Sequence, residues 1–150
     1  MPEDGIFGKA FVKKENITLC GGIVVIEKLH GLIENLPDAE GNFIPGCTKK
    51  LVFGPSRYWP DYAMRCFILE PHAQAKIHSH KWPHYLLVHK GLGRMQIDGE
   101  QFMLQEGTWV FVPGDLEHGF ENLSESEKLH MICIVPPEGD VNPLKTDAGA

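Results

Sequence analysis

The sequence lacks an excess of positive charge, and it lacks any long apolar run. Its 150 residues include 14 lysines and arginines against 20 aspartates and glutamates, for a formal net charge of −6. This balance gives no electrostatic attraction to nucleic acid or to anionic membranes, and we expect neither partner. No segment approaches the length of a transmembrane helix, and no secretory signal peptide is apparent at the N-terminus.

Paired cysteines are missing as well. The four cysteines are scattered, without a CxxC pair, at Cys20, Cys47, Cys66 and Cys133. In a chain without an apparent secretory signal, such cysteines are expected to be reduced thiols. We therefore expect a soluble, cytoplasmic protein. A length of 150 residues suffices for one domain with its own hydrophobic core.

Long amphipathic helices are absent from the pattern, and short apolar runs take their place. Turn signals separate runs that we predict as strands: Ile17–Lys28 (one or two strands), Ala63–Glu70, Ala75–His80, His84–His89, Arg94–Ile97, Gln101–Leu104, Thr108–Val112, His118–Glu121 and Lys128–Val135. Asp98-Gly99 is typical of a type I′ hairpin turn. The segment Leu29–Ser56 is predicted to be irregular, with a short helical turn near Leu32–Leu36. The pattern indicates an all-β sandwich or closed barrel.

The predicted organisation is one domain in three parts. Residues 1–61 form an N-terminal arm with the early strands, and they belong to the same domain as the rest. Residues 62–139 form the barrel core. Residues 140–150 are expected to be a flexible tail.

What the chain has in abundance is histidine, with eight residues, three of which fall within seven positions. In a strand, residues two apart share a face, so His78 and His80 are predicted to point the same way. If the run that begins at His84 pairs back on the first strand, its imidazole approaches the other two. His118 opens a later strand. Neutral imidazoles that converge in a dry barrel suit zinc, copper, iron or nickel.

The spacing around these histidines resembles the cupin family. The first cupin motif, approximately G-x5-H-x-H-x3-4-E-x6-G, is matched by His78, His80, His84 and Gly91. The second, approximately G-x5-P-x-G-x2-H-x3-N, is matched by Gly107, Pro113, His118 and Asn122. The resemblance implies an antiparallel double-stranded β-helix, the jelly-roll or cupin barrel. It also implies one divalent metal ion per chain (Mn, Fe, Ni, Zn or Cu) on His78, His80, His84 and His118.

Three positions depart from the motifs. His72 stands in place of the first glycine, and Gly114-Asp115 displaces the second-motif glycine. His84 occupies the position of the usual glutamate ligand, as in a four-histidine subgroup of small cupins with the pattern H-S-H-x-W-x-H. Four neutral ligands do not reduce the +2 charge of a divalent ion. On a six-coordinate ion they leave two open coordination positions, which we expect to be adjacent. Such a site suits a small bidentate oxygen chelator.

Three further residues are candidates for the pocket. Arg65 is either a solvent-facing strand residue or, as the subgroup resemblance favours, a residue next to the ligands or the substrate. Phe120 shares a face with His118 by alternation and is a candidate for the pocket wall. Cys133 is expected in the core, where its sulfur would approach the metal if the last strand lines the barrel. No catalytic residue is predicted, because no nucleophile pair or general base stands out.

Two functions follow from the resemblance. The first is an enzyme of the dioxygenase, isomerase, cyclase or lyase type that acts on a small oxygenated molecule, with the metal supplying the chemistry. The alternative is a non-catalytic cupin module that binds or senses a small molecule. A metal-free structural cupin is a third possibility, against which the four histidines argue. The resemblance also implies a homodimer, and the apolar run Ile17–Ile26 has the β-branched residues of an edge strand that could be added to the partner's sheet.

Overall fold

The computed structural model of the protein describes residues 16–19, 22–25 and 29–141, which fall into two units, Met1–Gly31 and Leu32–Ala150. In the first unit, β1 (Asn16–Leu19) and β2 (Gly22–Val25) pair antiparallel. The predicted run Ile17–Lys28 thus contains two strands, although residues 20–21 and 26–28 lie outside the described part. Most of the predicted tail, residues 142–150, lies outside it too.

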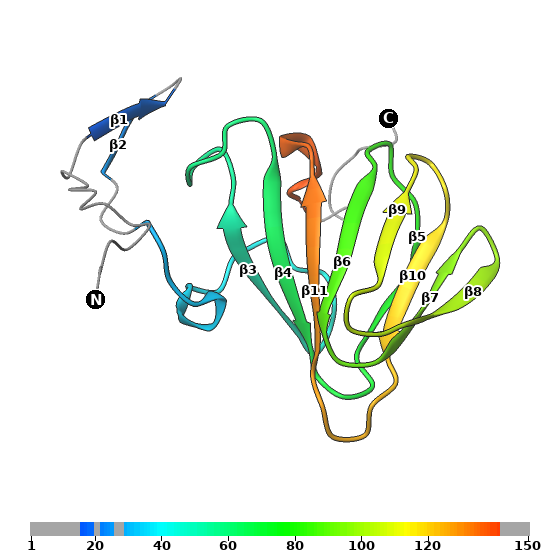
Figure 1. Ribbon diagram of the computed structural model, residues 1–150. Coiled ribbons are helices and arrows are strands. Elements are labelled where there is room, and N and C mark those ends of the chain that lie inside the picture. The colour runs from blue at the N-terminus through cyan, green and yellow to red at the C-terminus, as the bar shows by residue number, and fades with distance from the viewer. Residues whose placement is uncertain (1–15, 20–21, 26–28, 142–150) are drawn as a thin grey trace, which may run out of the picture. The chain divides into compact units, whose positions relative to one another are not determined.

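The described part of the second unit, residues 32–141, holds nine strands and two 3-10 turns. They are η1 (Ile33–Asn35), β3 (Cys47–Phe53), β4 (Ala63–Leu69), β5 (Gln74–His78), β6 (His84–Lys90), β7 (Gly93–Ile97), β8 (Glu100–Leu104), β9 (Trp109–Val112), β10 (His118–Asn122), β11 (Leu129–Val135) and η2 (Pro137–Gly139). The strands form two antiparallel sheets, with orders β3-β4-β11-β6-β9 and β5-β10-β7-β8 (Figure 1). This arrangement confirms the all-β double-stranded β-helix. In the described ranges, no helix is long and apolar enough to cross a membrane.

Local sequence explains the regular strands. In β9, the residues Trp109 and Phe111 are exposed while Val110 and Val112 are buried, as expected for a sheet with one face toward the core. The β7–β8 hairpin turns at Asp98 and Gly99, whose φ angles of 47° and 83° are both positive. Two consecutive positive φ angles define the type I′ turn, so the hairpin prediction is confirmed.

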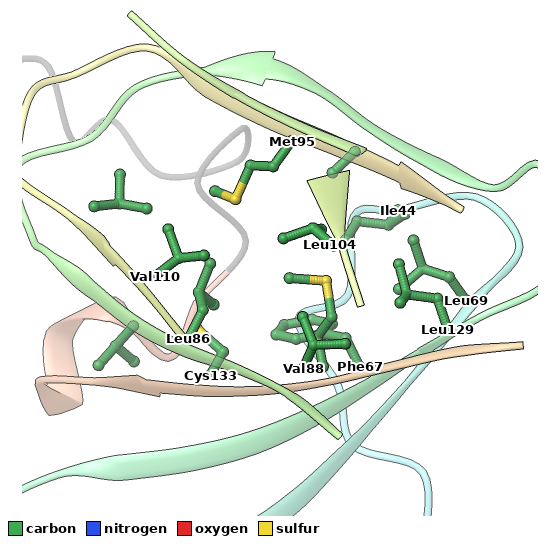
Figure 2. Packing of buried hydrophobic residues seen from close by; sticks show 14 of the residues in the cluster. Ile44, Phe67, Leu69, Leu86, Val88, Met95, Leu104, Val110, Leu129 and Cys133 are labelled. Carbon is green, nitrogen blue, oxygen red and sulfur yellow. The ribbon is translucent and has the colours of Figure 1, made fainter. Parts of the chain in front are cut away.

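The core lies between the two sheets. Leu104 of the four-stranded sheet packs with Leu69, Val88 and Leu129 of the five-stranded sheet, and Figure 2 shows these side chains gathered between the ribbons. Each of these four is at most 1% exposed. Other core residues, among them Phe67 and Met95, also line a cavity, so the hydrophobic core and the site described below share walls.

One strand contradicts the sequence-based expectation. The segment Leu29–Ser56 contains the predicted helical turn as η1, but its prediction as irregular is wrong for Cys47–Phe53. These residues form β3, the edge strand that pairs with β4. The adjacent lysines Lys49 and Lys50 break the apolar alternation by which strands are recognised, and lysine is typical of edge strands, where it discourages pairing with other chains.

Candidate metal centre

Four histidines from three strands and one loop converge between the sheets. His78 ends β5, His118 begins β10, and the two are direct cross-strand partners, with ring centroids 4.5 Å apart. His80 follows two residues after β5, and its ring lies 4.8 Å from that of His118. His84 begins β6, and its ring lies 4.5 Å from that of His80 and 5.2 Å from that of His118. The structure thus brings all four sequence-predicted ligands together.

The route of His84 to the site differs from the expected one. The strand it begins, β6, does not pair back on β5; it pairs with β11 and β9 in the opposite sheet. His84 therefore reaches the cluster from across the barrel, because the chain changes sheets between His80 and His84. The predicted strand Ala75–His80 also stops short, at His78, and His80 is placed by the loop that follows.

Three of the imidazoles are oriented by the main chain. The Nδ1 atoms of His78, His80 and His118 lie 2.7, 2.9 and 2.8 Å from the carbonyl oxygens of Lys76, Trp82 and Leu116. A carbonyl oxygen can only accept a hydrogen bond, so each Nδ1 carries the hydrogen and each Nε2 keeps its lone pair. One ring nitrogen from each of these histidines lies within 4.8 Å of the others. These three rings therefore present a ready set of donor atoms.

His84 is oriented by side chains instead. Its Nδ1 lies 3.0 Å from Cys133 Sγ, and its Nε2 lies 2.7 Å from His80 Nε2. Because His80 Nε2 carries no hydrogen, His84 Nε2 must donate here, and His84 Nδ1 then accepts from the Cys133 thiol. His84 must change tautomer before its Nε2 can bind a cation, with Nδ1 then donating to the sulfur.

The protein environment keeps these imidazoles neutral. Burial lowers the pKa of His80 to about 4, with the nearby rings of His118 and His78 adding to the effect. Burial lowers the pKa of His118 to about 4 and, together with His80 and His118, that of His84 to about 2. The pKa of His78 is also lowered by burial. At neutral pH all four imidazoles are thus uncharged. The Nε2 atoms of His78, His80 and His118 are available to a cation directly, and that of His84 after its change of tautomer.

The histidines form the polar part of an otherwise apolar cavity. It contains about 550 Å³ of space not filled by protein atoms, part of which is open solvent at its mouth. Its walls are mostly apolar and aromatic, and in the described part of the chain they contain no carboxylate. The residues that line it are Gly41, Phe43, Ile44, Arg65, Phe67, His78, His80, Trp82, His84, Leu86, Met95, His118, Phe120, Met131, Cys133, Gly139 and Val141. All three sequence-predicted pocket candidates are among them.

The placement of Arg65 settles its two interpretations. It is 2% exposed and lines the cavity, so the solvent-facing interpretation is wrong. Alternation on β4 turns Arg65 inward between Met64 and Cys66, which lie on the outer face. Its guanidinium donates to Cys133 Sγ over 3.1 Å and to the Asp140 carboxylate over 3.2 Å, and it lies over the ring of Phe67.

A buried network continues from Arg65. Lys49, 3% exposed, forms a 2.7 Å ion pair with the same oxygen of Asp140. Burial alone would raise the pKa of Asp140, but the contacts with Lys49 and Arg65 hold it below its usual value. Burial raises the pKa of Cys133, and Arg65 opposes this shift. Two buried cations thus share one carboxylate, which leaves one net positive charge beside the cavity.

Sequence reasoning missed Lys49 and Asp140. Lys49 lies in the segment predicted to be irregular, and Asp140 lies in the residues assigned to the tail, so neither was connected with the barrel. The alternation of strand residues could have identified part of the apolar cavity wall. Phe67 follows Arg65 by two residues, and Met131 precedes Cys133 by two, so both share a face with a predicted pocket candidate.

The departures from the second motif have a local explanation. A Cβ on Gly114 would lie 2.2 Å from the Lys81 carbonyl oxygen, so only glycine allows this close approach. The next residue, Asp115, has a positive φ of 69° and donates its backbone N–H to the His80 carbonyl over 2.7 Å. The Gly114-Asp115 turn therefore closes directly on the loop that carries His80. Trp82 of this loop stacks on the His80 ring at 4.3 Å.

Comparisons with known proteins lead to the same architecture. A family model described as "Cupin domain" matches residues 65–135. An uncharacterized protein of Aquifex aeolicus (strain VF5) is 34% identical over 116 residues, which are 77% of this chain and 81% of that protein. The match at this identity extends well beyond the histidine motifs.

Solved structures with this fold are more distant in sequence. The polyketide cyclase RemF from Streptomyces resistomycificus has a TM-score of 0.64 at 16% identity, over 75% of this chain and 80% of its own. An RmlC-like cupin from Shewanella frigidimarina NCIMB 400 has a TM-score of 0.59 at 17% identity, over 73% of this chain and 91% of its own. At these identities the likeness establishes the fold alone.

Proposed function

Because the chain belongs to the cupin family, we propose that it binds one divalent transition metal ion and uses it as an enzyme on a small oxygenated molecule. The ligands in this proposal are four histidines, namely His78, His80, His84 and His118. The observation that carries the proposal is the convergence of three imidazoles whose Nδ1 atoms are fixed by backbone carbonyls. Such bonds from the distal nitrogen orient metal-binding histidines in general.

The residues present fit a metal ion. His118 Nε2 is buried and has no hydrogen-bond partner in the described part of the chain, which is costly for a polar atom unless a cation or water occupies the site. The neighbouring donor atoms are neutral imidazole nitrogens, which suit zinc, copper, nickel and iron better than calcium or magnesium. His84 completes the set when its Nδ1 donates to Cys133.

The ion, when bound, supplies Lewis-acid polarisation of an oxygen ligand and open coordination positions. The chain's own contribution is electrostatic and steric. Arg65 adds a buried positive charge to the cavity wall, and four neutral imidazoles do not reduce the charge of the ion. Leu86, Met95 and Phe120 provide an apolar wall that excludes water and strengthens these fields.

The charge balance favours an anionic ligand. An unbalanced buried charge is costly, and the pair Lys49 and Arg65 exceeds the single Asp140 carboxylate by one charge. A small carboxylate-bearing chelator, such as a 2-keto acid, would compensate it while occupying two positions on the ion. Enediols and β-diketones offer the same pair of oxygens and bind as anions after losing a proton.

The proposal is tested by turnover. The protein is stripped of metal, reloaded separately with Mn²⁺, Fe²⁺, Ni²⁺, Zn²⁺ or Cu²⁺, and assayed under air with 2-keto acids, enediols and β-diketones. We expect steady turnover with at least one ion, lost in His80→Ala and kept in His89→Ala, whose exposed imidazole lies on the outer face of β6. Binding without turnover would identify the alternative, a cupin module that binds or senses a small molecule.

A further inference from the structure

Lys49 is buried at a place where a second positive charge is not needed to balance the structure. Lys49 and Arg65 are the two buried lysine or arginine residues in the described part of the chain. Both bind Oδ1 of Asp140, at 2.7 and 3.2 Å. Arg65 and Asp140 alone would form a neutral pair, so Lys49 is the source of the surplus charge. A buried charge without a counter-charge costs free energy, and a cost of this kind is typical of functional sites.

The surplus charge acts at the cavity through Arg65. Neither Lys49 nor Asp140 lines the cavity, whereas Arg65 and Cys133 do. The contacts that join Lys49 to Asp140, Asp140 to Arg65 and Arg65 to Cys133 are 2.7, 3.2 and 3.1 Å long, so they run from the lysine to the cavity wall. Because Lys49 offsets the negative charge of Asp140, the positive charge of Arg65 is left without a counter-charge. No carboxylate in the described cavity wall replaces it.

Backbone contacts fix Lys49 in this position. Its Nζ also donates to the carbonyl oxygen of Glu40 over 2.9 Å, and its own carbonyl oxygen accepts from the N–H of Ala39 over 2.8 Å. The chain that continues from Glu40 forms part of the cavity wall with Phe43, whose ring lies against that of His78. The ammonium group is therefore held between this segment and Asp140, where it has a fixed distance from the cavity.

We propose that Lys49 is a specificity-determining residue, which leaves the cavity with one net positive charge through Asp140 and thereby selects anionic over neutral ligands. The inference rests on the proposed function, which makes the cavity a ligand site, but it needs neither a metal ion nor turnover. At an effective dielectric constant of about 20, one charge about 10 Å from a ligand changes its affinity about tenfold. An inward-pointing lysine that only protects an edge strand from pairing with other chains would leave this preference unchanged.

The neighbouring residue on β3 offers a matched control. Successive residues of a strand point to opposite faces, and Lys50 pairs instead with Asp38, whose side chain is 74% exposed. Lys50→Met removes the same charge from the same strand as Lys49→Met, but from a pair that salt screens. Asp140→Asn changes the charge beside the cavity in the opposite direction. The double variant Lys49→Met/Asp140→Asn restores one net positive charge, that of Arg65.

The thiol of Cys133 serves as the probe, because it lines the cavity beside Arg65. Its sulfur displaces iodide from iodoacetate, which is an anion, and from iodoacetamide, which is a neutral molecule of nearly the same size. The ratio of the two rate constants cancels the pKa and the exposure of the thiol, so it reports the charge of the cavity. The full chain is treated with a chelator, and the modification of Cys133 is followed by mass spectrometry of its peptide.

We expect Lys49→Met to lower the ratio of iodoacetate to iodoacetamide rate constants about tenfold, and Asp140→Asn to raise it by a similar factor. Lys50→Met and the double variant should stay within about twofold of the natural protein. Thermal unfolding shows which variants are folded, and Asp140→Asn carries the test if Lys49→Met does not fold.

Equal ratios in Lys49→Met and Lys50→Met would overturn the proposal, as would an unchanged ratio in Asp140→Asn. A Cys133 thiol that reacts with neither reagent would overturn it too, because a cavity closed to molecules of this size selects no ligand. A lack of turnover in the metal-loaded protein would contradict the proposed enzyme and leave these ratios as predicted.

Discussion

The four histidines of the cavity are held in two different ways. His78, His80 and His118 donate Nδ1–H to backbone carbonyls, so their tautomers are already those that a metal ion needs. His84 depends on the Cys133 side chain and currently points its Nε2 hydrogen at His80. The comparison teaches that the orientation of three proposed ligands is a property of the fold, whereas that of the fourth depends on a side-chain network that single substitutions can change.

Removing a backbone-anchored histidine should have the largest effect. The ring of His118 lies within 5.2 Å of the other three rings. In His118→Ala, we expect metal affinity to fall by more than about 100-fold, a larger loss than removal of a residue that only orients a ligand would cause. Competition with a chelator of known affinity measures the loss. His89→Ala on the outer face is the control. Equal affinities for the two variants would show that the ion binds elsewhere.

The pH dependence of stability should distinguish the two kinds of histidine in the metal-free protein. The pKa values of His80 and His118 are lowered to about 4 and that of His84 to about 2, below the unfolded value near 6.5. The unfolded chain therefore takes up protons first, and stability should fall as pH drops below about 6.5. Each of these histidines contributes about 1.4 kcal/mol per pH unit to the slope of the free energy of unfolding against pH. The contribution of His80 and His118 ends near pH 4, and that of His84 extends to lower pH.

Urea unfolding between pH 7 and 4.5 measures this slope. His84→Gln should reduce it by about 1.4 kcal/mol per pH unit relative to the natural sequence, since the other titrating groups are common to both proteins. A slope that is the same in both proteins would mean that His84 titrates normally in the folded state. The loss of metal on acidification should begin at lower pH than the ordinary histidine pKa suggests.

Substitution of Cys133 should affect only the side-chain-held ligand. In Cys133→Ala, the Nδ1–H of metal-bound His84 would lack an acceptor, and we expect metal affinity to fall about 10- to 100-fold. Cys133→Ser keeps an acceptor and should stay within a few-fold of the natural protein. If both variants bound metal as tightly as the natural protein, Cys133 would have no part in orienting His84.

Arg65 should affect the preference of the site for anionic over neutral ligands more than it affects the affinity for the metal ion. Pyruvate and methyl pyruvate offer the same pair of carbonyl oxygens but differ by one charge. Arg65 Nη2 lies no more than about 6 Å from His84 Nδ1, since Cys133 Sγ bridges them at 3.1 and 3.0 Å. We expect Arg65→Gln to reduce the preference for pyruvate about tenfold in calorimetric titrations of the metal-loaded protein. If the preference for pyruvate were unchanged in Arg65→Gln, the metal ion alone would account for it.

The smallest effect is expected for His84→Glu. Glutamate is the usual cupin residue at this position, so the metal should remain bound. The added negative charge lowers the net charge of the site by one, and anion binding should weaken several-fold. Titration of pyruvate against the loaded variant measures the change, and tighter binding than in the natural protein would contradict the electrostatic argument.

The strand positions of the barrel could largely be predicted from its turns, whereas the double-stranded β-helix was predicted from the resemblance to the cupin motifs. Each strand from β4 to β11 is bounded by glycine, proline or another turn former, and each predicted range matches the observed one within about two residues. The strand β3 was missed because Lys49 and Lys50 interrupt its apolar pattern. Local spacing predicted that His78 and His80 meet, because histidines two residues apart stay close in any strand or loop, whereas His118 was included only through the resemblance to the second cupin motif.

Contacts between distant segments could not be predicted. The strands that pair with β6 depend on how the chain crosses between the sheets, so the prediction that β6 pairs back on the preceding strand was wrong. The contact of Arg65 with Cys133 joins residues 68 apart, and that of Arg65 with Asp140 joins residues 75 apart. No periodicity in the sequence relates such pairs, because only the pairing of β4 with β11 brings them together.

The central claim, that all four histidines bind one ion, is tested most directly by a crystal structure of the metal-loaded protein with anomalous scattering at the metal edge. We predict a single ion bonded to the Nε2 atoms of His78, His80, His84 and His118 at about 2.1 Å, with His84 Nδ1 donating to Cys133. An ion bound to only three histidines, with His84 still hydrogen-bonded to His80, would contradict the account, as would an ion at any other place.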